Sequence, residues 1–139
     1  ENNVNIFLPI DYVCSHSINQ IKDIKICDAY NIPNDLSGYD IGKKSIKAFT
    51  NIISQSKTII WNGPMGVFEV KRFSNGTFKV SESITSATIN GAYSLVGGGD
   101  SVAAINKSNN KNNISFISTG GGALLELLAK GTLPALRLL

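Results

Sequence analysis

Three short, glycine-rich segments hold the residues of this sequence that are best suited to chemistry. They are residues 62–66, 97–101 and 119–122, and each follows a run of apolar residues. Glycine has no Cβ, so a ligand can approach the backbone N–H groups of such a turn directly. A helix that begins there adds the positive end of its dipole, which favours bound phosphate. One such turn alone could equally be a plain connection, but three together predict a phosphate-bearing ligand.

Three side chains near these turns add possible chemistry. Asp100 is a natural partner for Mg²⁺, which is usually bound by one or two carboxylates together with phosphate oxygens. Alternatively, Asp100 caps the helix that begins beside it, and the two roles are compatible. Ser101 offers a hydroxyl to phosphate, while Glu69 is either a partner for ribose hydroxyls or an ordinary exposed carboxylate.

Composition and charge exclude several classes of protein. A length of 139 residues suits one domain or a large part of one, and 42% hydrophobic and 17% charged residues are typical of globular proteins. The net charge of +3 is small and scattered, so we expect no nucleic-acid partner. No apolar run is long enough to span a bilayer, so we expect no membrane partner.

Histidine and cysteine usage narrows the chemistry further. His16 is the only histidine, so no Ser/His/Asp triad can be assembled, and no Walker A pattern follows the glycines. Cys14 and Cys27 have no neighbours at metal-ligand spacing, so we interpret them as buried, reduced thiols. A disulfide between them is the alternative.

Apolar runs and helical periodicities alternate along the chain. Strands are predicted at residues 4–9 (continuing through 11–15), 24–27, 57–61, 92–96 and 114–117. Helices are predicted at residues 43–55, 76–90 and 100–107, and a further one opens at 118–122 with a buried stripe of Leu124, Leu125, Leu127 and Leu128. Residues 31–42 are predicted as a loop, with Asp40 capping the helix that follows.

This alternation predicts an α/β fold: a parallel sheet with helices on both faces, in a Rossmann-like three-layer α/β/α arrangement. Strands that are apolar throughout are buried on both faces, as in parallel sheets. Right-handed crossovers bring the strand-to-helix loops to one edge of the sheet. That edge is where open α/β sheets bind ligands, so we expect all three glycine-rich turns to meet there.

Longer motifs make the sequence similar to a known family. Residues 61–69 (Trp-Asn-Gly-Pro-Met-Gly-Val-Phe-Glu), 97–101 (Gly-Gly-Gly-Asp-Ser) and 118–123 (Ser-Thr-Gly-Gly-Gly-Ala) closely resemble phosphoglycerate kinase. Their order and spacing match the later part of that family's C-terminal, nucleotide-binding domain. The resemblance implies that residues 1–139 are an incomplete C-terminal domain, and that the N-terminal substrate domain is absent.

The activity implied by this resemblance is phosphoryl transfer between 1,3-bisphosphoglycerate and ADP, giving 3-phosphoglycerate and Mg-ATP. By the same resemblance, Gly38 borders the adenine, Asn62 and Pro64 border the nucleotide, and Glu69 holds the ribose.

The phosphate end of the site is implied in the same way. Gly98, Gly99, Asp100 and Ser101 meet the phosphates, with Asp100 as the ligand of Mg²⁺. Gly99 and Gly122 present backbone N–H groups to the migrating phosphoryl group, the catalytic role in this prediction.

The remaining expectations concern the protein as a whole. We expect ADP or ATP as partners, 3-phosphoglycerate through the missing domain, a monomeric state and a cytoplasmic location, and no turnover by this chain alone. One rival hypothesis is a non-catalytic nucleotide-binding module that keeps the glycine-rich turns. The other is a structural or partner-binding domain that uses the basic surface.

Overall fold

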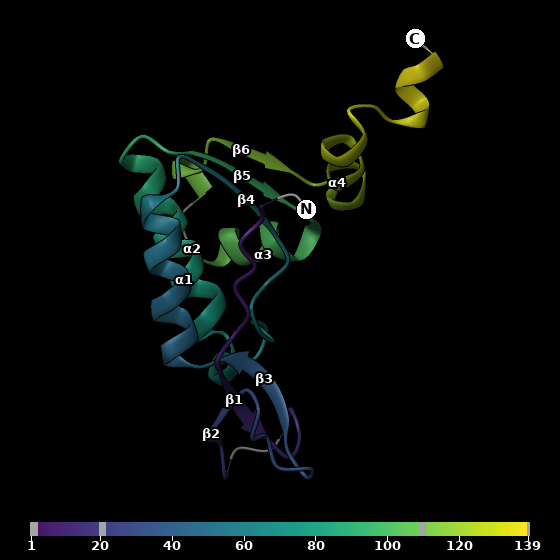
Figure 1. Cartoon of the computed structure of the whole chain (residues 1–139). Coiled ribbons are helices and arrows are strands. Elements are labelled where there is room, and N and C mark those ends of the chain that lie inside the picture. Colours follow the sequence, from purple (N-terminus) through teal and green to yellow (C-terminus); the bar gives the residue numbers. More distant parts are fainter. Residues whose placement is uncertain (1–2, 20–21, 109–110, 139) are drawn as a thin grey trace.

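The chain folds around two separate three-stranded sheets (Figure 1). The computed structural model describes residues 3–19, 22–108 and 111–138. An antiparallel sheet of order β2-β1-β3 contains β1 (Asp11–Ser15), β2 (Lys25–Asp28) and β3 (Ser37–Ile41). A parallel sheet of order β4-β5-β6 contains β4 (Thr58–Asn62), β5 (Tyr93–Gly97) and β6 (Phe116–Ser118).

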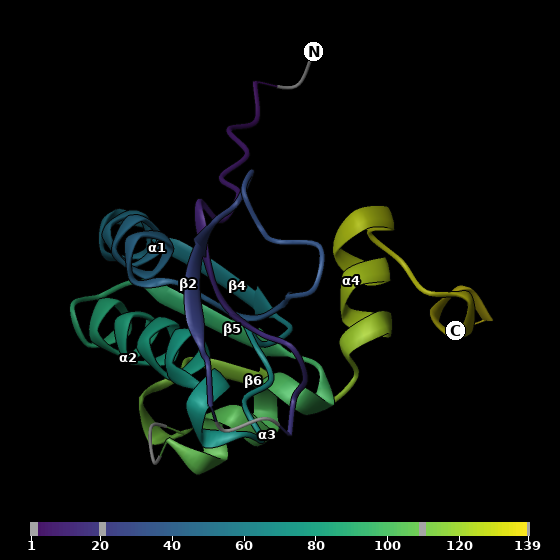
Figure 2. The ribbon, with the colours of Figure 1, turned by 90° about the horizontal axis from the view of Figure 1, so that it is seen from below.

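Two long helices join these sheets. The described residues form α1 (Lys43–Gln55), α2 (Asn75–Ile89), α3 (Gly99–Lys107) and α4 (Gly121–Lys130), with short 3₁₀ helices η1 (Lys71–Phe73), η2 (Lys111–Asn113) and η3 (Pro134–Leu138). Helices α1 and α2 lie side by side and run from the antiparallel sheet to the parallel sheet (Figures 1 and 2). The antiparallel sheet therefore sits at the N-terminal ends of both helices.

The main core lies between one face of the parallel sheet and the helices. Trp61 of β4 is paired with Val96 of β5, and both side chains are buried. Ile84 of α2 and Ile105 of α3 pack into the same cluster, and Ile53 of α1 packs against it. Each apolar side chain of this size contributes about 1.5–3 kcal/mol when fully buried.

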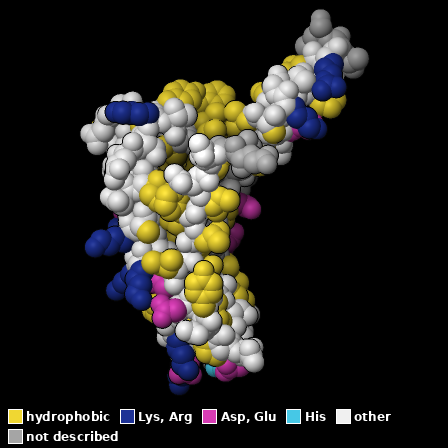
Figure 3. All heavy atoms as spheres, in the orientation of Figure 1, with side chains coloured by type: hydrophobic (Ala, Val, Ile, Leu, Met, Phe, Trp, Pro, Cys, Tyr) yellow, Lys and Arg dark blue, Asp and Glu magenta, His cyan; other side chains and the backbone are white. Residues whose placement is uncertain are grey.

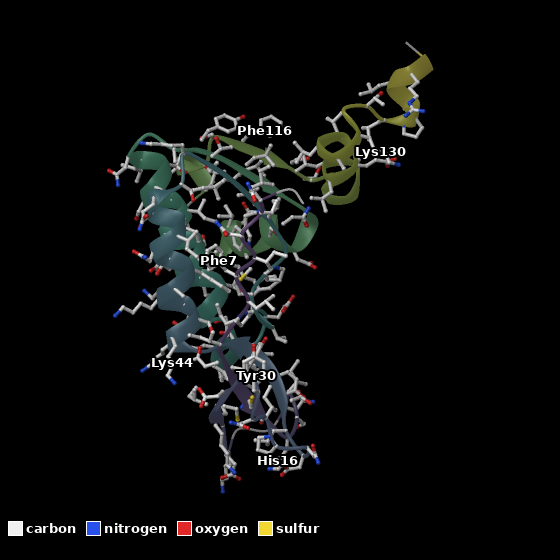
Figure 4. All side chains as sticks on the ribbon, viewed as in Figure 1. Phe7, His16, Tyr30, Lys44, Phe116 and Lys130 are labelled. Atoms are coloured by element: carbon white, nitrogen blue, oxygen red, sulfur yellow. The ribbon has the colours of Figure 1, made fainter. Side chains whose placement is uncertain are left out.

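The opposite face of the parallel sheet is uncovered. Ile60, Leu95 and Phe116 are aligned across the three strands, and Ile60 and Phe116 are each about half exposed. Hydrophobic side chains are visible above the sheet in Figure 3, and Figure 4 shows Phe116 projecting from that face. The described residues thus supply helices on one face of the sheet only.

The predicted fold class is confirmed as a partial α/β domain with a parallel sheet. Helix 43–55 is reproduced to the residue, and helix 76–90 is displaced by one residue, because their apolar faces pack on the core. The expected thiols are also confirmed: Cys14 and Cys27 are free and buried in the antiparallel sheet. Burial, with a contribution from Cys27, raises the pKa of Cys14 to about 11.

Three predictions in the first third of the chain are wrong. Residues 4–9 form no strand, and apolar side chains there, such as Val4 and Ile6, are more than 70% exposed. A short apolar run indicates burial, but no neighbouring strand pairs with it in the described part of the chain. Conversely, β3 falls inside the predicted loop 31–42, where turn-forming residues hide a strand that pairs with β1. Strand β1 itself belongs to the antiparallel sheet and does not join the parallel one.

The predicted buried stripe of leucines is wrong as well. Helix α4 has no buried residue, Leu125 and Leu128 are about half exposed, and the helix extends away from the body (Figure 1). Amphipathic spacing indicates which face a helix would bury, but not whether a surface is present to cover it. Among the described residues, no helix has the length and apolarity needed to cross a lipid bilayer.

Candidate functional site

The three glycine-rich turns meet at the carboxyl edge of the parallel sheet, as predicted. Asn62 Nδ2 donates to the carbonyl of Gly121 at 3.4 Å, which joins the first turn to the third. The N–H of Gly63 donates to Ser101 Oγ at 2.7 Å, which joins the first turn to the second. The N–H of Gly98 donates to the carbonyl of Ser118 at 3.2 Å, so the second and third are joined too.

The glycines of these turns divide into two kinds. At Gly97, Gly98 and Gly121 the absence of a side chain serves packing: a Cβ on Gly121 would lie 2.7 Å from Gly98 Cα. Gly98 also has a φ of +90°, which favours glycine. At Gly99 and Gly122, by contrast, a Cβ would meet nothing within 4 Å. These two glycines therefore border open space, where a ligand can approach the backbone.

Two helix N-termini open onto this space. The first N–H bonded within α3 is that of Val102, which donates to Gly98, so the N–H groups of residues 99–101 precede the helical ladder. In α4 the first N–H bonded within the helix is that of Leu124, which donates to the carbonyl of Gly120. The N–H groups of residues 121–123 therefore precede the helical ladder in the same way. Neither N-cap residue supplies a side-chain bond. Within the described part of the chain these two adjacent sets of donors have no hydrogen-bond partner, and each lies at the positive end of a helix dipole, an arrangement that can bind a large anion.

Asp100 and Ser101 occupy different environments although they are adjacent. Asp100 is exposed in the first turn of α3, so a cation can reach its carboxylate. Ser101 is 1% exposed, and its hydroxyl oxygen accepts the hydrogen bond from Gly63. Ser101 therefore ties two turns together, and the contact of its hydroxyl with phosphate stays a prediction. Within the described ranges, no three His, Cys, Asp or Glu side chains cluster as metal ligands.

The residues predicted at the base and ribose end lie on neighbouring segments. Gly38 is exposed on β3, Asn62 ends β4, and Pro64 and the exposed Glu69 follow in the connection to η1. The N–H of Val67 donates to the carbonyl of Tyr39 at 2.9 Å. This bond joins the segment that carries Glu69 to the strand that carries Gly38.

Sequence reasoning missed the carboxylates that support this arrangement. Asp40 was predicted to cap α1, which is wrong: its Oδ2 accepts the N–H of Gly76 at the start of α2, at 2.8 Å. The helix that follows Asp40 is instead capped by Asp11, which accepts the N–H groups of Lys44 and Ser45. The sequence carries little signal for either partner, because Asp40 lies in a stretch predicted as a loop and Asp11 begins a short strand.

The two buried aspartates are shifted in opposite directions. Burial alone would raise the pKa of Asp11. The Ser45 hydroxyl, the N–H groups of Ser45 and Lys44 and the charge of Lys44 outweigh it and lower the pKa below its ordinary value. Burial raises the pKa of Asp40 above its ordinary value, and hydrogen bonds from the N–H groups of Gly76, Ile41 and residue 75 only partly offset it.

Comparison with known proteins places this geometry in a family. The family model of phosphoglycerate kinase matches residues 1–131. Curated relatives include phosphoglycerate kinases of Finegoldia magna, 46% identical over 98% of this chain and 34% of that protein, and Porphyromonas gingivalis, 48% identical over 98% of this chain and 32% of that protein. The chain thus spans about a third of the length of the curated relatives it matches.

Solved structures agree with the sequence relatives. The phosphoglycerate kinase from Coxiella burnetii superposes with a TM-score of 0.87 at 36% identity, covering 97% of this chain and 34% of that one. The enzyme from Pyrococcus horikoshii superposes with a TM-score of 0.73 at 33% identity, covering 93% of this chain and 31% of that one. The predicted resemblance is confirmed in both sequence and fold.

Proposed function

The chain belongs to the phosphoglycerate kinase family, and from this premise we propose that it forms the later part of the nucleotide-binding domain of such an enzyme. The reaction is the glycolytic transfer of a phosphoryl group from the carboxyl phosphate of 1,3-bisphosphoglycerate to ADP, giving 3-phosphoglycerate and ATP, or its reverse. One observation carries the proposal: the unused N–H groups at the starts of α3 and α4 face the same open edge.

In this proposal the nucleotide lies across the carboxyl edge of the parallel sheet. The adenine lies beside Gly38, and the ribose hydroxyls donate to Glu69. Asn62 and Pro64 border the middle of the nucleotide. The Tyr39–Val67 hydrogen bond supports this order, because it holds the two outer segments next to each other.

The phosphates would lie against the start of α3, at Gly98, Gly99, Asp100 and Ser101. Asp100 would hold Mg²⁺, and its exposed position beside free N–H donors fits an ion that takes its other ligands from phosphate oxygens. The bound ion would supply positive charge that offsets the charge of the phosphates.

The chain's own contribution to catalysis is positioning. Phosphoryl transfer requires little covalent chemistry from the protein, and it is accelerated by aligned donors and neutralised charge. The backbone N–H groups of Gly99 and Gly122, which border open space, would donate to the migrating phosphoryl group from the two sides of the edge. The phosphoglycerate would be supplied by a domain outside these residues, so we expect no turnover from this chain alone.

The test is a coupled assay of ATP formation from 1,3-bisphosphoglycerate by the full-length protein. Asp100→Asn is expected to lower metal-dependent turnover by about a hundredfold or more, because the phosphate charge is no longer offset. Glu82→Gln is the matched control, since Glu82 is an exposed carboxylate paired with Lys79 on α2, and turnover should stay within about twofold.

Other results would decide against the proposal. Nucleotide binding without any turnover by the wild-type protein would identify the rival, a non-catalytic nucleotide-binding module. Full activity of the Asp100→Asn variant would remove Asp100 from the metal site. Binding of another macromolecule that falls steeply with salt and ignores ATP would favour the partner-binding domain.

The state of the protein in the cell is part of the same proposal. We expect a monomer in the cytoplasm that binds small molecules and no nucleic acid. The free, buried Cys14 and Cys27 support a reducing compartment. Size-exclusion chromatography of the full-length protein with in-line light scattering tests the monomer, and a stable dimer would contradict it.

A further inference from the structure

Asp40 is a buried carboxylate whose role the phosphate chemistry does not explain. It is 2% exposed at the end of β3. Its Oδ1 accepts the N–H of Ile41 at 2.9 Å, and its Oδ2 accepts the N–H of Gly76 at 2.8 Å. Among the described residues, no lysine or arginine forms an ion pair with it. The cost of burying its charge is therefore partly offset by backbone donors and by the N-terminal end of α2.

The same carboxylate is enclosed by two glycines. A Cβ on Gly66 would lie 2.4 Å from Asp40 Oδ1, and a Cβ on Gly76 would lie equally close. Gly66 belongs to the first glycine-rich turn, and Gly76 belongs to the first turn of α2. Asp40 is thus packed between the predicted nucleotide-binding segment and the helix beneath it, with no room for a side chain on either.

A second contact joins that helix to that segment. Thr77, in the first turn of α2, is fully buried, and its Oγ1 accepts the N–H groups of Met65 at 3.1 Å and Gly66 at 3.3 Å. The next residue, Val67, donates to the carbonyl of Tyr39, which directly precedes Asp40. Three successive N–H groups of the segment are therefore held by the start of α2 and the end of β3.

We propose that Asp40 is a positioning residue for nucleotide binding, which holds the segment from Asn62 to Glu69 in register with Gly38 through the first turn of α2. The proposal rests on the nucleotide site described above. Asp40 does not touch the ligand; it sets the distance between the strand beside the base and the segment beside the ribose. Its loss should weaken nucleotide binding and leave phosphoglycerate binding and the chemical step unchanged.

The test compares two isosteric variants of the full-length protein. Asp40→Asn places an amide donor against a backbone donor, so we expect the KM for ADP to rise about tenfold, with kcat and the KM for 1,3-bisphosphoglycerate within about twofold. Asp11→Asn is the matched control, because Asp11 is equally buried and holds the same antiparallel sheet to α1. Among the described residues, it makes no hydrogen bond to the glycine-rich turn at residues 62–66. Its KM for ADP should stay within about twofold.

A second variant covers the case in which Asp40→Asn does not fold. Thr77→Val keeps the shape of the side chain and removes the acceptor for Met65 and Gly66, so the KM for ADP should rise by a similar factor. An unchanged KM for ADP in a folded Asp40→Asn protein, or in Thr77→Val, overturns the inference. An equal rise in Asp11→Asn overturns it as well, since a purely structural effect would then suffice. Absence of turnover in the wild-type protein would instead refute the proposed function.

Discussion

The helices of this chain begin in two different ways. Helices α1 and α2 start against carboxylates of the antiparallel sheet, Asp11 and Asp40, which accept N–H groups of the first turn. Helices α3 and α4 start on Gly98 and Gly120 at the edge of the parallel sheet, where no carboxylate among the described residues accepts an N–H group of the first turn. A buried carboxylate of the antiparallel sheet therefore meets the first pair of helix ends. At the second pair the described residues show no such buried partner, and the only first-turn carboxylate is the exposed Asp100 of α3.

This difference separates architecture from function. A carboxylate that meets a helix N-terminus accepts N–H groups there and interacts favourably with the dipole, so Asp11 and Asp40 can anchor the antiparallel sheet to α1 and α2. An open end must stay at the surface, because its donors depend on water or a ligand. In the proposed function, Asp11 and Asp40 of the antiparallel sheet support the fold, while the glycine-rich edge binds the nucleotide together with Gly38 of β3.

The largest expected effect comes from forcing the two open ends apart. Gly121→Ala places a Cβ 2.7 Å from Gly98 Cα, so the starts of α3 and α4 must separate. We expect a loss of about 1–3 kcal/mol of stability and a fall in turnover of about a hundredfold. Urea unfolding and the coupled assay on the full-length protein measure both. Retained activity would mean that the two ends need not be adjacent.

Removing the carboxylate that accepts N–H groups at the start of a helix should lower the stability of the protein. Asp11→Ala leaves the N–H groups of Lys44 and Ser45 and the Ser45 hydroxyl without their acceptor, at about 2–4 kcal/mol. Asp28→Ala on the same sheet is the control, because Asp28 is exposed and pairs with Lys44 at the surface; about 0.5 kcal/mol or less is expected. Equal losses in urea unfolding would contradict the distinction.

The contributions of Asp11 and Asp40 to stability should change in opposite directions with pH. The pKa of Asp11 is lowered, so its contribution to stability is present above about pH 4 and is lost as the pH falls through the folded value. The pKa of Asp40 is raised, so its contribution is full below about pH 4 and is lost as the pH rises through the folded value.

Unfolding free energies of wild type, Asp11→Asn and Asp40→Asn, measured from neutral pH down to below about pH 4, test the direction of each pH dependence. The deficit of Asp11→Asn relative to wild type should shrink on acidification. The free energy of unfolding of the wild type should rise relative to that of Asp40→Asn as the pH falls from neutral toward about pH 4. Parallel profiles for the two variants would show that both carboxylates are held alike.

The smallest effect is expected at the open ends themselves. A Cβ on Gly122 meets nothing within 4 Å, and alanine is a better helix former than glycine, so Gly122→Ala should stabilise the protein by about 0.5–1 kcal/mol. The melting temperature of the full-length protein measures this. A lower melting temperature would show that Gly122 serves packing, as Gly121 does.

The sequence predicted the glycine-rich edge of the parallel sheet better than the carboxylates that support it. The three turns could be brought together because parallel strands end at a common edge, a rule that needs only the order of elements. The contact between Asp40 and Gly76 joins residues 36 positions apart and leaves no periodic signal. Strand β3 was missed for a similar reason, since its pairing with β1 outweighs the turn-forming residues around it. For the leucines of α4, spacing indicated a face but could not supply the surface that covers it.

The uncovered face of the parallel sheet has a practical consequence. Ile60, Tyr93 and Phe116 are each half exposed on neighbouring strands, and apolar surface of this kind promotes association in water. A sample of only these 139 residues should bind hydrophobic dyes and increase their fluorescence. It should also precipitate at lower concentrations than the full-length protein.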